Sequence, residues 1–257
     1  MKIFIFGANG MLGSYISKYI DSVQITRKDI DASKILQMRK RLNVINPVRG
    51  DVIINCIGIT NKQRKSKRSF FIVNSLFPKL LADYCEDRGV NMIHISTDCV
   101  FSGKDGGYDE YSIPDELSVY GLSKSSGEPD NCSVIRTSII GENRNSDLDL
   151  LEWVRKHKGK EINGWVNHFW NGVTCLQFAK ICKELIDNKD FHFKLRHYFS
   201  ETVSKAELIE MINDIYELGI KVNKVETDIC DRTLTSRFDC TMPSLRKQII
   251  EQKQFNI

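Results

Sequence analysis

The chain has 257 residues, of which 41% are hydrophobic and 27% are charged, and its formal net charge is +4. This length can form one large domain or a core domain with a small appendage, and this charge neither demands nor excludes a polyanionic partner. The sequence contains no signal peptide and no apolar stretch near the ~18 residues of a membrane span, so we expect a cytoplasmic protein without a membrane partner.

The N-terminus reads as a strand, a glycine-rich turn and a helix. Residues 1–6 form an apolar run typical of a buried parallel strand, and a helical stretch covers residues 14–21. Between them, Gly7, Gly10 and Gly13 permit a tight turn, close approach of phosphates and close helix packing. This order favours a dinucleotide site, with its pyrophosphate on the helix N-terminus, over an ordinary glycine-rich turn.

Apolar strands then alternate with amphipathic helices. The sequence predicts strands over residues 23–26, 51–58, 90–97 and 132–137 and helices over residues 32–42, 69–88 and 120–128. This rhythm implies an α/β fold with a doubly wound, Rossmann-like parallel sheet that binds ligands at the carboxyl ends of its strands. Gly7, Gly58, Thr97 and Thr137 fall at such ends, so we expect one crevice to collect the candidate residues.

The most basic run, residues 62–68, lies in a predicted loop after a strand. Such runs can bind nucleic acid, but no aromatic side chains are interleaved here. We therefore expect a solvated loop near a phosphate-bearing ligand and no nucleic-acid partner.

The eight cysteines show neither a Cys-x-x-Cys pair nor a cluster with histidine, so the sequence predicts no metal site. Several lie in apolar runs, as buried thiols do, which favours a reduced protein. They are Cys56, Cys85, Cys99, Cys132, Cys175, Cys182, Cys230 and Cys240.

Tyr120 and Lys124 are four residues apart and would share one face of a helix. An unperturbed phenol has a pKa near ~10, and an ammonium one turn away stabilises the phenolate and lowers that pKa. Such a pair can act in proton transfer, although any amphipathic helix can carry the same spacing.

After about residue 140 the pattern changes. We predict helices over residues 148–158, 176–188 and 204–219, the last with a capping box of Ser204 and Glu207, and a polar, aromatic loop over residues 163–172. The predicted organisation is an NAD(P)-binding Rossmann domain, residues 1–140, and a small, mainly substrate-binding α/β region, residues 141–257, part of which returns to the Rossmann sheet.

These motifs together resemble the extended short-chain dehydrogenase/reductases, and among them the sugar-nucleotide 4-ketoreductases similar to dTDP-4-dehydrorhamnose reductase. The resemblance spans nearly the whole chain. It rests on the segments at residues 7–13, 51–55, 96–103, 120–128 and 136–138. It implies NAD(P)H-dependent reduction of the 4-keto group of a nucleotide-linked 6-deoxyhexose, in deoxysugar biosynthesis for a surface polysaccharide or glycan.

The resemblance also implies roles for individual residues. Tyr120 would protonate the developing alkoxide, Lys124 would hold the nicotinamide ribose and lower the tyrosine pKa, and Thr97, rather than Ser96, would hydrogen-bond the carbonyl oxygen. Asn74 is either a cofactor contact or a helix-surface residue. The cofactor-binding positions so implied are Gly7, Asn9, Gly10, Met11, Leu12, Arg27, Lys28, Asp31, Cys56, Gly58, Asn74, Tyr120 and Lys124.

Charge at the end of the second strand bears on the choice of cofactor. NAD sites commonly place an acid there, whereas this chain has Arg27 and Lys28, which suit a 2′-phosphate. Asp31 follows, where relatives have an acidic segment beside the adenine. We therefore expect NADPH rather than NADH, with solvated loop charges as the alternative.

Cys99 departs from the rhamnose-type pattern, which has tyrosine after Ser-Thr-Asp. A cysteine at this position resembles the pattern of GDP-fucose synthase, where a thiol is the acid in epimerising C3 and C5 before reduction. That chemistry also needs a histidine base, but residues 145–150 contain none, and His157 and His168 are out of register. We therefore favour the interpretation that Cys99 is a small buried residue that shapes the sugar pocket. A bifunctional 3,5-epimerase/4-reductase that uses Cys99 is the alternative.

The substrate-binding candidates are residues that can stack on a base or sugar, pair with a diphosphate or bind a hydroxyl. They are Asp98, Thr137, Trp165, His168 and Arg232. We expect a nucleotide-sugar substrate and regard a homodimer as an option. A non-catalytic, NADP-binding regulatory subunit is the alternative of another class, but both Tyr120 and Lys124 are present, which favours an enzyme.

Overall fold

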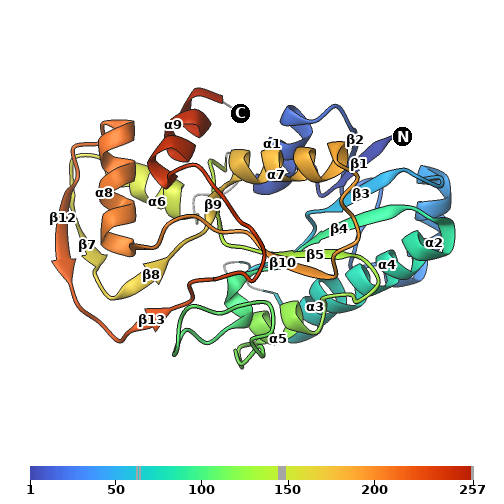
Figure 1. Cartoon of the computed structure of the whole chain (residues 1–257), viewed down its shortest axis with the longest axis horizontal. Helices are drawn as coiled ribbons and strands as arrows, with labels where there is room; N and C mark the ends of the chain where they lie inside the picture. The colour runs from blue at the N-terminus through green and yellow to red at the C-terminus, as the bar shows by residue number, and fades with distance from the viewer. Residues whose placement is uncertain (62, 64, 144–148, 256–257) are drawn as a thin grey trace.

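The computed structural model describes residues 1–61, 63, 65–143 and 149–255. Its centre is a six-stranded parallel sheet with the strand order β10-β5-β4-β3-β1-β2 (Figure 1). The strands are β1 (Ile3–Phe6), β2 (Val23–Ile25), β3 (Val52–Asn55), β4 (Asn91–Ile95), β5 (Ser133–Arg136) and β10 (Leu195–His197). The predicted doubly wound α/β fold is confirmed.

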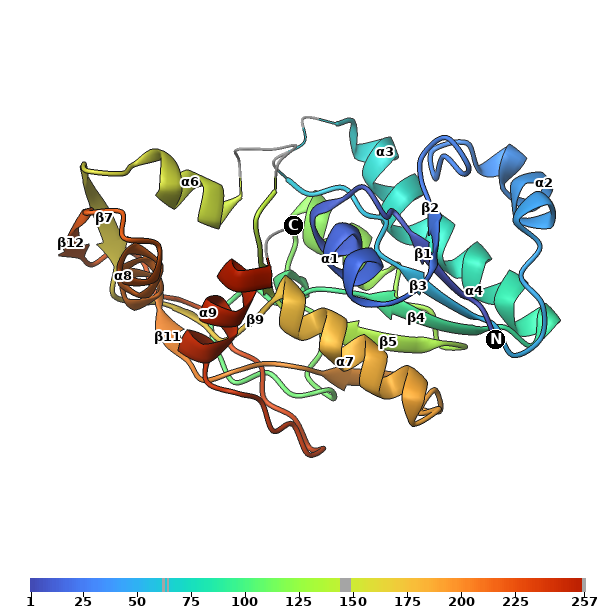
Figure 2. The ribbon, with the colours of Figure 1, turned by 90° about the horizontal axis from the view of Figure 1, so that it is seen from above.

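Helices cover both faces of this sheet (Figures 1 and 2). On one face lie α1 (Met11–Tyr19) and α7 (Cys175–Asp187), and on the other lie α2 (Ile35–Ile45), α3 (Lys67–Phe71), α4 (Phe77–Arg88) and α5 (Val119–Ser125). All four residues of β3 are buried, as expected for an inner strand with helices on both sides. Two apolar cores result, one on each face.

The predicted helix over residues 69–88 is one helical run of three parts. α3 passes into a π-helical segment, η1 (Ile72–Leu76), which continues into α4. Such π-helical turns often occur at functional sites. Here the π-helical segment carries Asn74, which is 1% exposed and therefore not the helix-surface residue of the alternative reading.

A smaller unit, called the second region below, lies beside the sheet (Figure 2). It contains helices α6 (Leu150–Lys156) and α8 (Lys205–Tyr216) and five strands: β7 (Glu161–Trp165), β8 (His168–Trp170), β11 (Val203–Ser204), β12 (Lys221–Val225) and β13 (Cys230–Asp231). β12 pairs with β7, and β8 lies between β11 and β13. The capping box that was predicted for α8 is present, with both Ser204 and Glu207 hydrogen bonds made.

The prediction of a loop over residues 163–172 is wrong, because most of this segment lies in β7 and β8. β7 finds its hydrogen-bonding partner at residues 221–225, and its residues alternate between exposed and buried. A strand whose pairing partner lies far along the chain gives little local signal. Within β7 the polar residues Glu161 and Asn163 occupy exposed positions.

A final helix, α9 (Leu245–Phe255), was not predicted. It buries Gln248 and Gln252 together with Leu245 and Ile249, so its inner face looks polar in the sequence. The two amide oxygens accept hydrogen bonds from the backbone N–H groups of Thr174 (3.1 Å) and Leu176 (3.3 Å) at the start of α7. α9 therefore joins the second region to the sheet domain.

The chain passes back and forth between the sheet domain and the second region. β6 (Ile139–Ile140) leaves the sheet and pairs with β9 (Val173–Thr174), which leads directly into α7. α7 packs on α1, and β10 then pairs with β5 at the edge of the sheet. The division at residue 140 remains a prediction about function.

The basic run 62–68 lies partly outside the described residues, and so do most of residues 145–150 and the start of the helix predicted from residue 148. Among the residues that the structure describes, no helix combines the length and apolar character needed to cross a membrane.

Candidate active site

The glycine turn closes tightly over the start of α1. Gly10 N–H donates to the carbonyl of Gly7 at 2.9 Å, and Gly10 is the N-cap of α1. A Cβ atom on Gly13 would lie 2.2 Å from the Gly7 oxygen, so the close approach of helix and turn requires glycine at this position. The turn therefore presents the α1 N-terminus to the carboxyl edge of the sheet, as a pyrophosphate site requires.

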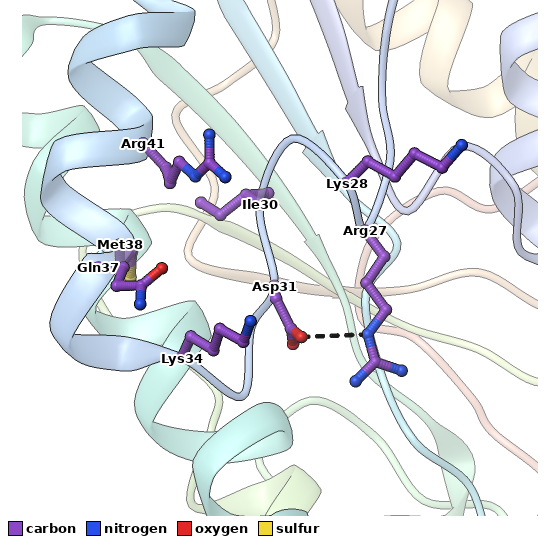
Figure 3. Close-up of a pocket in the computed structure, with 8 residues that line it drawn as sticks. All are labelled: Arg27, Lys28, Ile30, Asp31, Lys34, Gln37, Met38 and Arg41. Carbon is purple, nitrogen blue, oxygen red and sulfur yellow. Dashed lines mark hydrogen bonds and ion pairs between the residues drawn. The ribbon is translucent and has the colours of Figure 1, made fainter.

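A cationic pocket of about 200 Å³ lies next to the end of β2 (Figure 3). Asp31 accepts from Arg27 Nε at 3.2 Å and from Ser33 Oγ at 2.7 Å, and these hydrogen bonds lower the pKa of its carboxyl group despite the opposing effect of burial. The pocket is lined by Arg27, Lys28, Ile30, Asp31, Lys34, Gln37, Met38 and Arg41.

Two of the cationic side chains that line this pocket were not identified from the sequence. Lys34 and Arg41 come from the start and middle of α2, and Figure 3 shows them on the opposite side of the pocket from Arg27. The Lys28 side chain points away from both in the same view. The helical spacing of residues 34, 37, 38 and 41 was the available signal, since it places all four on one face of α2. The pocket can hold a phosphate monoester between β2 and α2.

The predicted proton-transfer residues meet at the carboxyl end of β4. Tyr120 and Lys124 both lie on α5, and the Lys124 ammonium donates to the carbonyl of Ile95 at 2.7 Å. Thr97 Oγ1 donates to Asp98 Oδ1 at 3.0 Å and accepts from the backbone N–H of Cys99 at 3.1 Å. The Thr97 side chain also lies close enough to the Tyr120 hydroxyl to lower its pKa. The two hydroxyls are thus within reach of one substrate oxygen.

Burial controls the protonation of this pair. It raises the pKa of Tyr120, an effect that the nearby Cys99 and Asp98 reinforce and that the Thr97 side chain opposes. Burial also lowers the pKa of Lys124 to about 8, against the attraction of Glu128 and Cys56. We expected Lys124 to lower the tyrosine pKa, but desolvation outweighs other effects. The Tyr120 hydroxyl is therefore protonated at physiological pH.

Asn74 ties α5 to the loop after β3. Its side-chain oxygen accepts from Ile59 N–H at 2.9 Å, and its amide donates to Ile59 O at 2.9 Å and to Ser123 Oγ at 3.1 Å. Ser123 Oγ in turn donates to the carbonyl of Tyr120 at 2.9 Å. Asn74 fixes the backbone that carries both Tyr120 and the loop beyond Gly58.

A buried ion pair supports the same strand ends. Glu128 accepts from Arg136 Nε at 2.8 Å, from Arg136 Nη2 at 2.7 Å and from Ser96 Oγ at 2.5 Å. The Arg136 side chain is 4% exposed and also lies over the Phe101 ring. Bidentate pairs of this kind are strong and geometrically specific. The sequence motifs contained these residues, but nothing local indicated that Glu128 and Arg136 are bonded to each other.

Cys99 follows Thr97 directly, and burial raises the pKa of its thiol to about 12. Cys56, after β3, is also shielded, and burial raises its pKa. Both thiols are therefore protonated at neutral pH, and neither is an activated nucleophile.

The substrate-binding candidates are distributed over two places. Asp98 and Thr137 are buried at adjacent strand ends, where Asp98 N–H donates to Thr137 O at 3.2 Å. Trp165 and His168 lie together on the second region, with ring centroids 4.5 Å apart. Arg232 reaches the Cys99 segment from β13, but its guanidinium is bonded to Phe101 O and Glu116.

A smaller cavity of about 110 Å³ separates the glycine turn from the second region. Trp170 Nε1 donates to Ser138 Oγ at 2.8 Å across it, and Lys205 lies over the Trp170 ring. Lys205 was missed because its position at the start of α8 says nothing about the sheet edge that it faces. The cavity is lined by Met11, Ser138, Ile139, Ile140, Gly141, Asp149, Leu150, Trp170 and Lys205.

The parallel sheet, the glycine turn and the Tyr120–Lys124 pair at one edge define a protein of the short-chain dehydrogenase/reductase type. Comparison of the sequence with family models makes this more specific. The chain belongs to the family described as the RmlD substrate binding domain, whose model matches residues 1–201.

Among curated proteins, the chain is 30% identical to the dTDP-4-keto-6-deoxy-D-glucose reductase of Streptomyces niveus, over 66% of this chain and 63% of that protein. It is also 30% identical to the probable low-salt glycan biosynthesis reductase Agl14 of Haloferax volcanii, over 60% of this chain and 59% of that protein. The matched segments thus span less than two thirds of both relatives.

Among solved structures, the dTDP-4-dehydrorhamnose reductase of Bacillus anthracis in complex with NADP superposes with a TM-score of 0.83 at 21% identity, covering 99% of each chain. This likeness establishes the fold.

Proposed function

We propose that the protein is an NADPH-dependent oxidoreductase that reduces the 4-keto group of a nucleotide-linked 6-deoxyhexose. The observation that carries the proposal is the meeting of Thr97, Tyr120 and buried Lys124 at the sheet edge that also holds the glycine turn. The names of the relatives, which include a dTDP-4-keto-6-deoxy-D-glucose reductase and a glycan biosynthesis reductase, support the substrate class.

The residues present suit a bound dinucleotide phosphate. Gly13 allows α1 to pack closely on the glycine turn, as a pyrophosphate site requires, and the cations Arg27, Lys34 and Arg41 line a pocket fit for a 2′-phosphate. Two solved structures of similar fold, the Bacillus anthracis reductase and a Campylobacter jejuni GDP-mannoheptose C4 reductase, contain NADP. The cofactor would supply the hydride.

The chain supplies the proton and the geometry. The raised pKa of Tyr120 keeps its hydroxyl protonated, so it can donate to the oxygen on which negative charge develops. Thr97 Oγ1, which lies beside the Tyr120 hydroxyl, stabilises the same oxygen. Lys124, held at Ile95 O, is placed one helical turn from Tyr120 to bind the nicotinamide ribose.

The two parts of the chain would divide the work, residues 1–140 binding the cofactor and residues 141–257 mainly the sugar nucleotide. The cavity between Met11 and Trp170, where the parts adjoin, supports this division. We further propose a cytoplasmic location, which the eight free cysteines favour, and retain the homodimer as a prediction.

The test is a screen of dTDP-, UDP- and GDP-linked 4-keto-6-deoxy sugars, with NADPH or NADH, that follows the loss of reduced cofactor. We expect turnover with NADPH and a lower KM for NADPH than for NADH. Tyr120→Phe should lower kcat by about 10²–10⁴-fold, whereas Tyr111→Phe, an exposed control that is 71% accessible, should not. Binding of NADPH without turnover of any of these sugars would favour the regulatory-subunit alternative instead.

A further inference from the structure

Arg232 lies where the tail of the second region meets the catalytic segments. Its Nε donates to the carbonyl of Phe101 at 2.8 Å, and its Nη2 pairs with Glu116 Oε2 at 2.8 Å. Its Nη1 lies 4.0 Å from the Cys99 sulfur. The side chains of Arg232 and Glu116 are 31% and 18% exposed, so the pair is partly withdrawn from water. One guanidinium therefore contacts two segments that flank the proton-transfer site.

Glu116 transmits this contact to the catalytic helix. Its second carboxylate oxygen, Oε1, accepts from Ser118 N–H at 2.8 Å, and Ser118 is the N-cap of α5, accepting from Gly121 N–H at 3.2 Å. A Cβ atom on Gly121 would lie 2.2 Å from Glu116 Cγ and 2.8 Å from Cys99 O. The Glu116 side chain, the N-cap and the turn that contains Tyr120 are thus in close contact.

The other contact fixes the segment that carries Thr97. Phe101 and Cys99 follow Thr97 in the short helix η2 (Asp98–Val100) and the residue after it. Cys99 N–H donates to Thr97 Oγ1, so a shift of this segment would move the hydroxyl that lies beside Tyr120.

The Arg232 backbone is itself firmly held. β13 pairs with His168 and Phe169 of β8, and Asp231 N–H donates to Gly103 O at 2.8 Å. Thr233, two residues after Asp231, accepts a hydrogen bond from Tyr108 N–H at 2.9 Å through its carbonyl oxygen. The guanidinium is therefore anchored in the second region and reaches across to the sheet domain.

From these contacts we propose that Arg232 is a positioning residue, which holds Thr97 and Tyr120 in register through Phe101 and Glu116, and not a ligand of the substrate diphosphate. The expected effect of Arg232 on turnover rests on the proposed function. Nε and Nη2 of Arg232 already donate to Phe101 and Glu116 within the protein. Loss of Arg232 should therefore lower turnover more than it weakens substrate binding.

The kinetic test compares Arg232→Gln, Glu116→Gln and Arg232→Lys with the control Arg237→Gln. Arg237 comes from the same tail and pairs with Asp109 at 2.8 Å, but that pair does not touch α5. Arg232→Gln and Glu116→Gln should lower kcat by about 10–100-fold, the range expected for misplaced catalytic groups, with KM for the sugar nucleotide and Kd for NADP⁺ changed less than about threefold. Arg232→Lys should recover part of kcat, and Arg237→Gln should match wild type.

A raised KM at unchanged kcat in Arg232→Gln would identify a diphosphate ligand and overturn the proposal. Hydrogen exchange read by mass spectrometry provides a second measurement that needs no substrate. Arg232→Gln should speed exchange in peptides covering residues 99–101 and 116–123, whereas peptides of α1 and the Arg237→Gln protein should be unaffected. Unchanged exchange at both segments would refute the positioning role. Faster exchange in a protein that reduces none of the sugars would uphold it and reject the proposed function.

Discussion

Replacing Lys124 by methionine separates the stability of this fold from its proposed chemistry. The substitution keeps a long side chain and removes the ammonium. Lys124 is 6% exposed, and burial lowers its pKa from 10.5 to about 8. A charged lysine at this position therefore costs free energy of folding at neutral pH, and we expect Lys124→Met to remove this cost together with activity.

The size of the effect follows from proton linkage. A gap between a pKa of 10.5 in the unfolded chain and about 8 in the folded protein corresponds to about 3 kcal/mol at pH 7. Between these two values the unfolded chain binds more protons than the folded one, so stability rises with pH, and the cost falls to about 1 kcal/mol at pH 10. Leaving the Ile95 carbonyl without its 2.7 Å donor offsets about 1–2 kcal/mol of the gain.

Urea unfolding of wild type and Lys124→Met at pH 7 and pH 10 measures this dependence. The stability of the variant relative to wild type should fall by about 2 kcal/mol between the two pH values, because only wild type regains stability as Lys124 loses its proton. The exposed control Lys40→Met should show no such change. An equal difference between Lys124→Met and wild type at both pH values would refute the reasoning.

Glu128→Gln should lower the free energy of unfolding by about 3–5 kcal/mol because it strands buried Arg136, while Glu161→Gln, in an exposed pair, should cost under about 1 kcal/mol; equal losses would contradict this. Arg41→Ala should weaken the binding of NADP⁺ about 10-fold, as measured by calorimetry, and leave the binding of NAD⁺ unchanged. An equal loss of NADP⁺ affinity in Lys40→Ala would show that Arg41 does not bind the 2′-phosphate specifically. Since residues 145–150 contain no histidine that could act as the epimerase base, wild type should exchange no deuterium into C3 or C5 of the 4-keto sugar in D₂O without NADPH; incorporation would support the epimerase alternative.

The parts of the molecule that could be predicted are those whose signal is local. The glycine turn, the apolar inner strands and the Tyr120–Lys124 spacing each depend on residues within a few positions of one another, as the structure of β1, β3 and α5 shows. The helix boundaries also agree to within about three residues where a cap is present, as at Ser204.

The parts that were missed depend on distant residues. β7 needs residues 221–225 as its pairing partner, and α9 hides its helical period because glutamines fill half of its buried face. The Arg232 contact with Glu116 spans 116 positions, so no spacing rule could reveal it. Side chains such as Lys34, Arg41 and Lys205 acquire meaning only when a second element supplies the other wall of a pocket.

Glu128 shows why stability and proposed catalysis cannot be tuned independently here. Its carboxylate holds Ser96 and Arg136 at the strand ends, and its charge is also the strongest influence that keeps the pKa of Lys124 from falling further. A neutral residue at this position would therefore loosen the sheet edge and discharge Lys124 at lower pH. Because both effects come from the Glu128 carboxylate, its substitution would change the stability of the sheet edge and the pKa of Lys124 together.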